Sequence, residues 1–253
     1  MFGFGRKKER KLVFSSISHS AVGLVRTNNE DHLLVAPELG VYCVADGMGG
    51  GADGEKASQI VCAEIAMLVK CQKPEFAVRM EAACTAVVAA NESILDYSKR
   101  MGFDQMGTTV SMMMIDPEKP SQAAICHVGD SRIYRFRNRR AEPLTRDHSV
   151  AVELGDRLGA DFTSRSNPLA HVLTRAVGTS EKVCPDWKKI TIEAGDRYLF
   201  CTDGVHDVVS DGRLEDLLVG LSLEEAKKAL ITEVAKCGAP DNFSFIILDA
   251  EAE

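Results

Sequence analysis

Four aspartates that lie far apart in the sequence share one kind of setting. Each adjoins an apolar run rich in β-forming residues and stands next to a glycine or an asparagine: Asp46, Asp130, Asp203 and Asp241. Strand ends can bring such carboxylates together, and oxygen ligands are those that Mg²⁺ and Mn²⁺ prefer, whereas zinc usually recruits His or Cys. The pattern therefore predicts a site for divalent metal ions.

Two of these aspartates, Asp46 and Asp203, are each followed by a glycine, Gly47 and Gly204. A missing side chain lets a cation approach both the carboxylate and a nearby backbone carbonyl. Two cations about 3.5 to 4 Å apart lower the pKa of a bridging water and clamp the oxygens of an in-line displacement. The sequence has no GxSxG elbow and no cysteine signature loop, which fits a reaction without a side-chain nucleophile. Together these features predict a two-metal phosphohydrolase.

A phosphate substrate also needs a permanently charged partner, and Arg26 is the best placed candidate. It stands just ahead of Glu30 and Asp31. Because magnesium sites commonly keep several waters, we expect these two acids to hold water molecules that the metals bind.

Composition limits the class of protein. The chain has 253 residues, 45% of them hydrophobic, and a formal net charge of -7. A chain of this size can bury one sizeable core, so we expect a single domain over residues 12–253 after a basic tail at residues 1–11. Net acidity argues against general nucleic-acid binding.

The 8 cysteines form no CxxC pair and lie mostly in apolar runs, which favours reduced, buried thiols over disulfides or a zinc site. No stretch has the length and apolarity of a membrane span, and the N-terminus lacks the apolar region of a signal peptide. A cytoplasmic location is therefore expected.

Hydrophobic periodicity predicts strands on either side of two long helical regions, without regular βα alternation. The second helix is expected over residues 75–100, and the last over residues 223–237, with a capping box of Ser222 and Glu225 and with Gly238 at its end. Strands are expected at 12–18, 40–45, 108–115, 123–128, 132–136, 187–192, 197–202 and 243–248. This arrangement favours an α+β fold with stacked sheets between helices.

Short motifs that span nearly the whole chain carry a resemblance to a known family. In order they are Arg26–Asp31, Val44–Gly50, Gly54–Ser58, Gly107–Thr109, Val128–Arg132, Leu144–Ser149, Leu173–Gly178, Thr202–Asp207 and Asp241–Ser244. The sequence resembles the metal-dependent serine/threonine protein phosphatases of type 2C, in their compact bacterial form. The resemblance implies a four-layer sandwich, in which two central antiparallel β-sheets are flanked by helices on both sides.

The resemblance also implies roles for individual residues. Asp46 would bridge two Mg²⁺ or Mn²⁺ ions, the carbonyl of Gly47 would meet the second ion, and Asp203 with Asp241 would complete the first. Asp130, with Asp203, matches the place of a third ion in bacterial relatives, and Arg26 matches the arginine that holds the substrate phosphate. The implied reaction is hydrolysis of phosphoserine and phosphothreonine in proteins, which opposes a serine/threonine kinase.

The chain departs from the family pattern at the group that protonates the leaving oxygen. Met48 and Gly51 stand where relatives carry a histidine. A metal-bound water or His206 are the alternatives, and a packed imidazole is the simpler interpretation of His206. Residues 156–173 occupy the position of the family's variable flap, and their Gly, Asn and Pro content suggests a loop that contacts the phosphoprotein.

Two other functions stay open. One is a pseudophosphatase that binds a phosphoprotein or a regulator without turnover, and the other is hydrolysis of a small phosphorylated metabolite. The presence of all four metal aspartates favours an active enzyme. We expect a monomer that acts on phosphoproteins.

Overall fold

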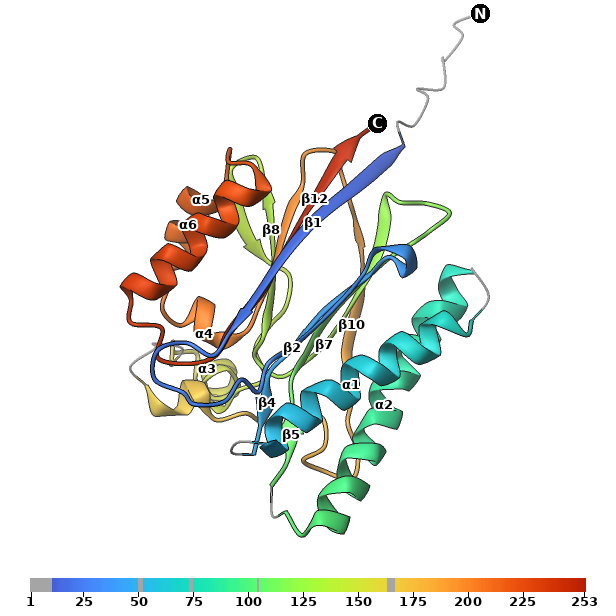
Figure 1. The fold of residues 1–253 in the computed structure, drawn as a ribbon, viewed down its shortest axis with the longest axis vertical. Coiled ribbons are helices and arrows are strands. Elements are labelled where there is room, and N and C mark those ends of the chain that lie inside the picture. Colours follow the sequence, from blue (N-terminus) through green and yellow to red (C-terminus); the bar gives the residue numbers. More distant parts are fainter. Residues whose placement is uncertain (1–10, 50–51, 73–74, 104, 163–166) are drawn as a thin grey trace, which may run out of the picture.

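The computed structural model describes residues 11–49, 52–72, 75–103, 105–162 and 167–253. Its core is a pair of five-stranded antiparallel sheets, which we call sheet A and sheet B (Figure 1). Sheet A has the order β1 (Leu12–Ala21), β12 (Phe243–Ala252), β11 (Arg197–Cys201), β8 (Arg132–Arg137) and β9 (Arg140–Pro143). Sheet B has the order β10 (Asp186–Thr191), β7 (Gln122–Val128), β6 (Val110–Ile115), β3 (Val41–Ala45) and β2 (His32–Ala36). A short pair, β4 (Gly47–Met48) and β5 (Gly107–Thr108), extends beyond β3.

Helices cover the outer face of each sheet (Figure 1). The long helices α1 (Ala52–Lys70) and α2 (Phe76–Met101) pack on sheet B. On sheet A lie α4 (Asp203–His206), α5 (Asp211–Leu218) and α6 (Leu223–Lys236). The helix α3 (Val150–Leu158) and the 3-10 turns η1 (Pro37–Leu39) and η2 (Pro168–His171) belong to connections. The predicted four-layer α+β sandwich is therefore confirmed.

Strands buried on both faces explain why the apolar runs are continuous. On β12, Phe245 and Ile247 face the helices of sheet A, whereas Ile246 and Leu248 enter the core between the sheets. This alternation follows from the two-residue period of a strand. Tyr42 of sheet B and Phe200 of sheet A meet in that central core, with ring centroids 6.3 Å apart. The two sheets thus form one packed unit that fixes where the strands end.

Most predicted elements are confirmed. The capping box of α6 is present, with Ser222 accepting from the Glu225 amide, and Gly238 follows the helix at φ 92°. Ser149 caps α3, and the nearby Asp147 binds Arg132 at 2.6 and 2.9 Å. The sequence patterns missed β2, β9, α4 and α5, which are short.

Some predictions concern residues outside the described ranges. Of the basic tail at 1–11 only Lys11 is described, and Gly51 and residues 163–166 of the flap are not. Within the described residues, no helix combines the length and apolarity that crossing a membrane requires.

Candidate metal centre

The ends of strands from both sheets surround one cavity of ≈870 Å³. Asp46 directly follows β3, and Asp130 lies between β7 and β8. Asp203 opens α4 after β11, and Asp241 stands two residues before β12. The predicted residues in the cavity wall are Arg26, Glu30, Asp46, Gly47, Asp130, Asp203 and Asp241. The four distant aspartates therefore converge on one place, as the sequence predicts.

Burial and mutual repulsion make these carboxylates hard to ionise without a cation. Burial raises the pKa of Asp46 well above its usual range, and the charges of Asp203, Asp31 and Asp130 add to the rise. Burial, followed by the charge of Asp203, does the same to the pKa of Asp130. The pKa of Asp203 is also raised by burial, although His206 offsets part of the effect. Charged carboxylates at such a site need a compensating positive charge.

Asp31 lies behind the cavity wall, and its side chain is partly unsatisfied. The residue is 6% exposed, and burial raises its pKa to about 7. Its Oδ2 accepts a hydrogen bond from Thr202 at 2.9 Å, whereas Oδ1 has no hydrogen-bond partner in the described part of the chain. The nearby Ser244 hydroxyl donates to Ser20 instead, at 2.8 Å. A buried, unpaired carboxylate oxygen is costly, so a water or ion is expected beside it.

Arg26 contacts one of the acids directly. Its guanidinium lies 2.7 Å from the Asp241 carboxylate, and 56% of its side chain is exposed. Arg26 thus supplies a positive charge at the rim of the cavity. An exposed ion pair of this kind contributes little to stability, so the guanidinium can exchange Asp241 for another anion at small cost.

Asn242 connects the loop before β12 with the loop between β1 and β2 through hydrogen bonds. It was not among the predicted site residues. Its Oδ1 accepts from the Glu30 amide at 2.8 Å, and its Nδ2 donates to the carbonyls of Val22 and Asn28 at 3.0 and 2.7 Å. Thr109 has a similar role, because its hydroxyl accepts from the Asp46 amide at 2.9 Å. Both residues lie inside motifs that carry the family resemblance, and this position was the only feature of the sequence that could have indicated their role.

The glycines at the site are explained by backbone packing. A Cβ added at Gly47 would lie 2.1 Å from the carbonyl oxygen of Gly54 and 2.6 Å from that of Glu30. At Gly204 a Cβ would lie 1.9 Å from the carbonyl oxygen of Asn242. Room for an ion was the expected reason for these glycines, and the structure adds close contact between loops as a second one.

His206 is a packed side chain, as the simpler interpretation predicts. It is 2% exposed, and its Nε2 lies 3.1 Å from the Asp130 carbonyl, to which it donates. Nδ1 lies 3.3 Å from the Asp207 carboxylate but has no aligned hydrogen bond among the described residues. His206 lines a neighbouring polar cavity of ≈360 Å³ and not the cavity that holds Asp46 and Asp203. The structure therefore gives no support to His206 as the leaving-group acid.

The donor set fits a hard divalent cation. The groups that face the cavity include carboxylates and the backbone at Gly47, while the cationic side chains in its wall are Arg26, Lys99 and Arg175. Among the residues described, however, no group of three or more His, Cys, Asp and Glu side chains already converges on one point. One physical reason is that Asp241 forms an ion pair with Arg26, which keeps its carboxylate directed toward the guanidinium. The structure thus brings the predicted ligands into one cavity, but no three of the described carboxylates are arranged to coordinate a single ion.

Comparison with known proteins points to a single family. A family model described as protein phosphatase 2C matches residues 18–243. The serine/threonine protein phosphatase PstP of Mycobacterium tuberculosis is 33% identical over 242 residues, which cover 94% of this chain but 45% of that protein. The chain therefore spans about half the length of this relative. The serine/threonine phosphatase stp of Listeria welshimeri is 30% identical, with 90% of this chain and 92% of that protein covered.

Solved structures agree with the fold. PppA, described as a key regulatory component of T6SS in Pseudomonas aeruginosa, superposes with a TM-score of 0.86 at 32% identity, over 95% of this chain and all of that one. The catalytic domain of PstP in complex with 2 manganese ions gives a TM-score of 0.82 at 31% identity, with 95% and 100% covered.

The raised pKa values predict how metal and pH affect stability. Asp31 has a folded pKa of about 7, above its unfolded value, so the folded state binds more protons between about pH 4 and pH 7. The metal-free protein should therefore lose stability as the pH rises through that window. Mn²⁺ should reverse the loss, raising the melting temperature by roughly 5 to 10 °C at pH 8 and by less at pH 6, where protons compete.

Thermal melts in EDTA and in Mn²⁺ at the two pH values check this prediction. Asp203→Asn removes one carboxylate and should abolish most of the Mn²⁺ effect, whereas Glu118→Gln, at an exposed turn, should preserve it. Equal stabilisation of both variants by Mn²⁺ would place the metal elsewhere.

Proposed function

Because the chain belongs to the protein phosphatase 2C family, we propose that it is a metal-dependent phosphatase that hydrolyses phosphoserine and phosphothreonine in proteins. The observation that carries the proposal is the convergence of Asp46, Asp130, Asp203 and Asp241 on a cavity that Arg26 also lines. Relatives named as serine/threonine phosphatases, one of which has nearly the same length, support this substrate class.

We propose that Asp46, Asp203 and Asp241, with the backbone of Gly47, hold two Mg²⁺ or Mn²⁺ ions. Asp130 would serve a third ion. When bound, the ions supply activation of a water and stabilisation of charge on the phosphate oxygens. The PstP catalytic domain with 2 manganese ions supports this assignment. Glu30 and Asp31 stay close to these ligands. The Asn242 side chain accepts a hydrogen bond from the Glu30 backbone amide, and the Thr202 hydroxyl donates one to the Asp31 carboxylate.

Arg26 is proposed to bind and orient the phosphate. Its guanidinium is already at the cavity, and among the described residues it is held by an exposed ion pair with Asp241. A dianionic phosphate offers better bidentate geometry than one carboxylate oxygen, so the guanidinium can transfer to it. Because Asp241 would be among the residues that hold the metal ions, that transfer would leave no acid without a partner.

The flap is proposed to contact the protein part of the substrate. His171, Val172 and Leu173 line the cavity, and Val172 is 48% exposed there. Leu158 and Leu169 add further exposed apolar surface to the same region. Exposed apolar side chains beside a polar cavity suit the residues that flank a phosphorylated side chain.

The chemistry also implies a partner reaction. Phosphoryl groups on serine and threonine are installed by a kinase, so an opposing serine/threonine kinase is proposed. A cytoplasmic location and a monomeric state are likewise proposals that come from the sequence.

A pseudophosphatase is the alternative that one observation favours. Three acids do not yet converge on one point within the described residues. Binding of a phosphopeptide without turnover in Mn²⁺ would establish this alternative. Against it stands the presence of all four predicted metal aspartates.

Turnover in Mn²⁺ tests the activity. Purified protein should hydrolyse p-nitrophenyl phosphate and a phosphothreonine peptide, with the peptide preferred. EDTA and Asp203→Asn should each lower kcat by more than about 100-fold, because metal ions contribute several kcal/mol to such reactions. Glu118→Gln serves as the control and should retain the wild-type kcat. A preference for small phosphorylated metabolites over the peptide would contradict the proposed substrate class.

Arg26→Ala should lower kcat/KM by about 10- to 100-fold, the loss expected from one strong charge-assisted contact. The Mn²⁺-induced rise in melting temperature should be retained, since Arg26 is not proposed as a ligand. Arg26→Lys keeps the charge without the planar fork and should recover only part of the activity. A matching loss of metal stabilisation in Arg26→Ala would contradict the assigned role.

Val172→Ala should raise KM for a phosphothreonine peptide about threefold, because it removes apolar contact area, and leave KM for p-nitrophenyl phosphate unchanged. Val88→Ala is the matched control, because Val88 is a similarly exposed valine that lies on α2 and is absent from the cavity wall. Equal effects of both variants on both substrates would rule out a specific contact at Val172.

A further inference from the structure

The loop that carries Asp130 is held by a buried histidine. His148 is 3% exposed and stands two residues before α3, whose cap is supplied by Ser149. The backbone amide of His148 donates to the Gly129 carbonyl at 2.8 Å, and its Nδ1 accepts from the Gly129 amide at 3.0 Å. Both polar groups of Gly129 are therefore bound to His148, and Gly129 directly precedes Asp130.

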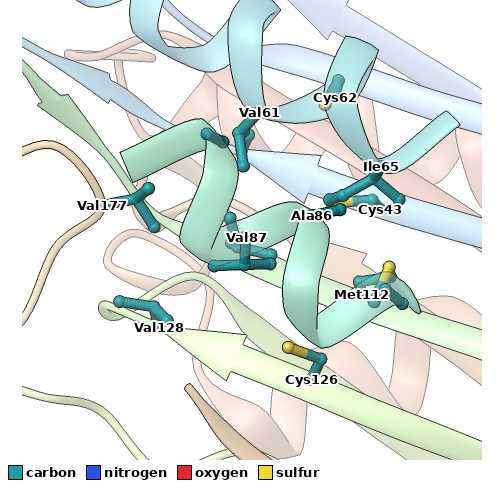
Figure 2. Close-up of a cluster of buried hydrophobic side chains, with 14 of the residues drawn as sticks. Cys43, Val61, Cys62, Ile65, Ala86, Val87, Met112, Cys126, Val128 and Val177 are labelled. Carbon is teal, nitrogen blue, oxygen red and sulfur yellow. The ribbon is translucent and has the colours of Figure 1, made fainter. Parts of the chain in front are cut away.

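Polar contacts must set this loop, because the apolar core ends just before it. Val128 is the last residue of β7, and both it and Val177 are fully buried. Figure 2 shows these two side chains in the core cluster on which α1 and α2 pack. Gly129 then turns at φ 104°, where a Cβ would lie 2.6 Å from Cγ2 of Thr109. The chain thus leaves β7 through a turn that suits glycine, and His148 supplies the hydrogen bonds of that turn.

The hydrogen bonds of His148 define where its proton lies. Burial, followed by the charge of Arg175, lowers the pKa of the imidazole below its ordinary value, so the ring is neutral at pH 7. Since the Gly129 amide donates to Nδ1, this nitrogen has a lone pair and the single proton is on Nε2. Nε2 lies 3.2 Å from Oδ2 of Asp186, to which it donates. Asp186 thus selects the tautomer that can accept from Gly129.

Asp186 also connects this histidine to the wall of the large cavity. Its Oδ1 accepts from Nη1 of Arg175 at 2.7 Å. Arg175 and Asp130 both line the cavity of ≈870 Å³. A chain of hydrogen bonds therefore runs from Arg175 to the loop of Asp130. Thr174 reinforces this chain, because its amide donates to the His148 carbonyl at 2.8 Å.

We propose that His148 and Asp186 are positioning residues for the Asp130 carboxylate. Asp186 keeps the imidazole proton on Nε2, and His148 then holds the Gly129 backbone in the conformation that places Asp130 in the cavity wall. The inference rests on the proposed role of Asp130 toward a third ion. Neither His148 nor Asp186 lines that cavity, so both act through the loop, as groups behind a metal ligand commonly do.

Asp186→Asn tests the tautomer without removing the histidine, and the Asp186 side chain is 58% exposed, so the fold should tolerate the change. Arg175 can only donate, so the one carboxamide oxygen of the variant should stay with the guanidinium while the NH₂ group faces Nε2 of His148. The ring proton should then move to Nδ1, where it opposes the Gly129 amide. Hydrogen exchange of that amide, followed by NMR in EDTA, should become about tenfold faster, as expected for the loss of one hydrogen bond.

A second substitution separates the tautomer effect from a structural defect. Adding Arg175→Met to Asp186→Asn removes the donor that holds the carboxamide oxygen, so this oxygen can turn to Nε2 of His148 and the slow exchange of Gly129 should largely return. A structural defect would instead grow with the second change. Asp216→Asn is the matched control, because Asp216 is also an exposed aspartate paired with an arginine, at 3.6 Å, and it should exchange like the wild type.

Manganese titration connects the loop to the proposed centre. The affinity of the Mn²⁺ site that Asp130→Asn removes should fall roughly tenfold in Asp186→Asn and stay unchanged in Asp216→Asn. Unchanged affinity or unchanged Gly129 exchange in Asp186→Asn would overturn the inference, as would a wild-type imidazole proton on Nδ1. A titration that Asp130→Asn leaves unaltered would overturn it together with the third-ion role of Asp130, and that variant alone identifies this case.

Discussion

The concentration of negative charge at one end of the sandwich is the constraint on which the rest of the structure depends. Asp31, Asp46, Asp130 and Asp203 come from separate parts of the chain, and each has a pKa raised first by burial. Such a group of acids is unfavourable in the folded state unless protons or cations compensate it. The fold must therefore be stable enough elsewhere to hold these residues together.

That stability comes from the core between the sheets and from short polar connections at the strand ends. Tyr42 and Phe200 join the two sheets, which leaves the ends of β3 and β11 in fixed positions. Asn242 and Thr109 then set the backbone that carries the acids. Apolar packing supplies the free energy, while these few hydrogen bonds supply the precision that a metal site requires.

Much of this arrangement could be predicted from the sequence, because long apolar strands and the capped helix α6 carry strong local signals. The four aspartates could be predicted too, since each adjoins such a strand. The helix α4 was missed because it is one turn long and begins at Asp203 itself. The contact of Arg26 with Asp241 and the crowding around Gly47 depend on loops that meet only in three dimensions, so no local pattern contains them. The sequence left His206 as a candidate acid. In the structure it is buried and lines a neighbouring cavity, which could not be read from the sequence.

The position of β12 in sheet A bears on how the protein is made. This strand lies between β1 and β11, and Asp241 stands two residues before it, so residues near both ends of the sequence complete the same sheet and the same site. During synthesis β1 and β11 emerge from the ribosome before their shared neighbour exists. The nascent chain therefore cannot complete sheet A, or bring Asp241 to the other three aspartates, until β12 has been translated.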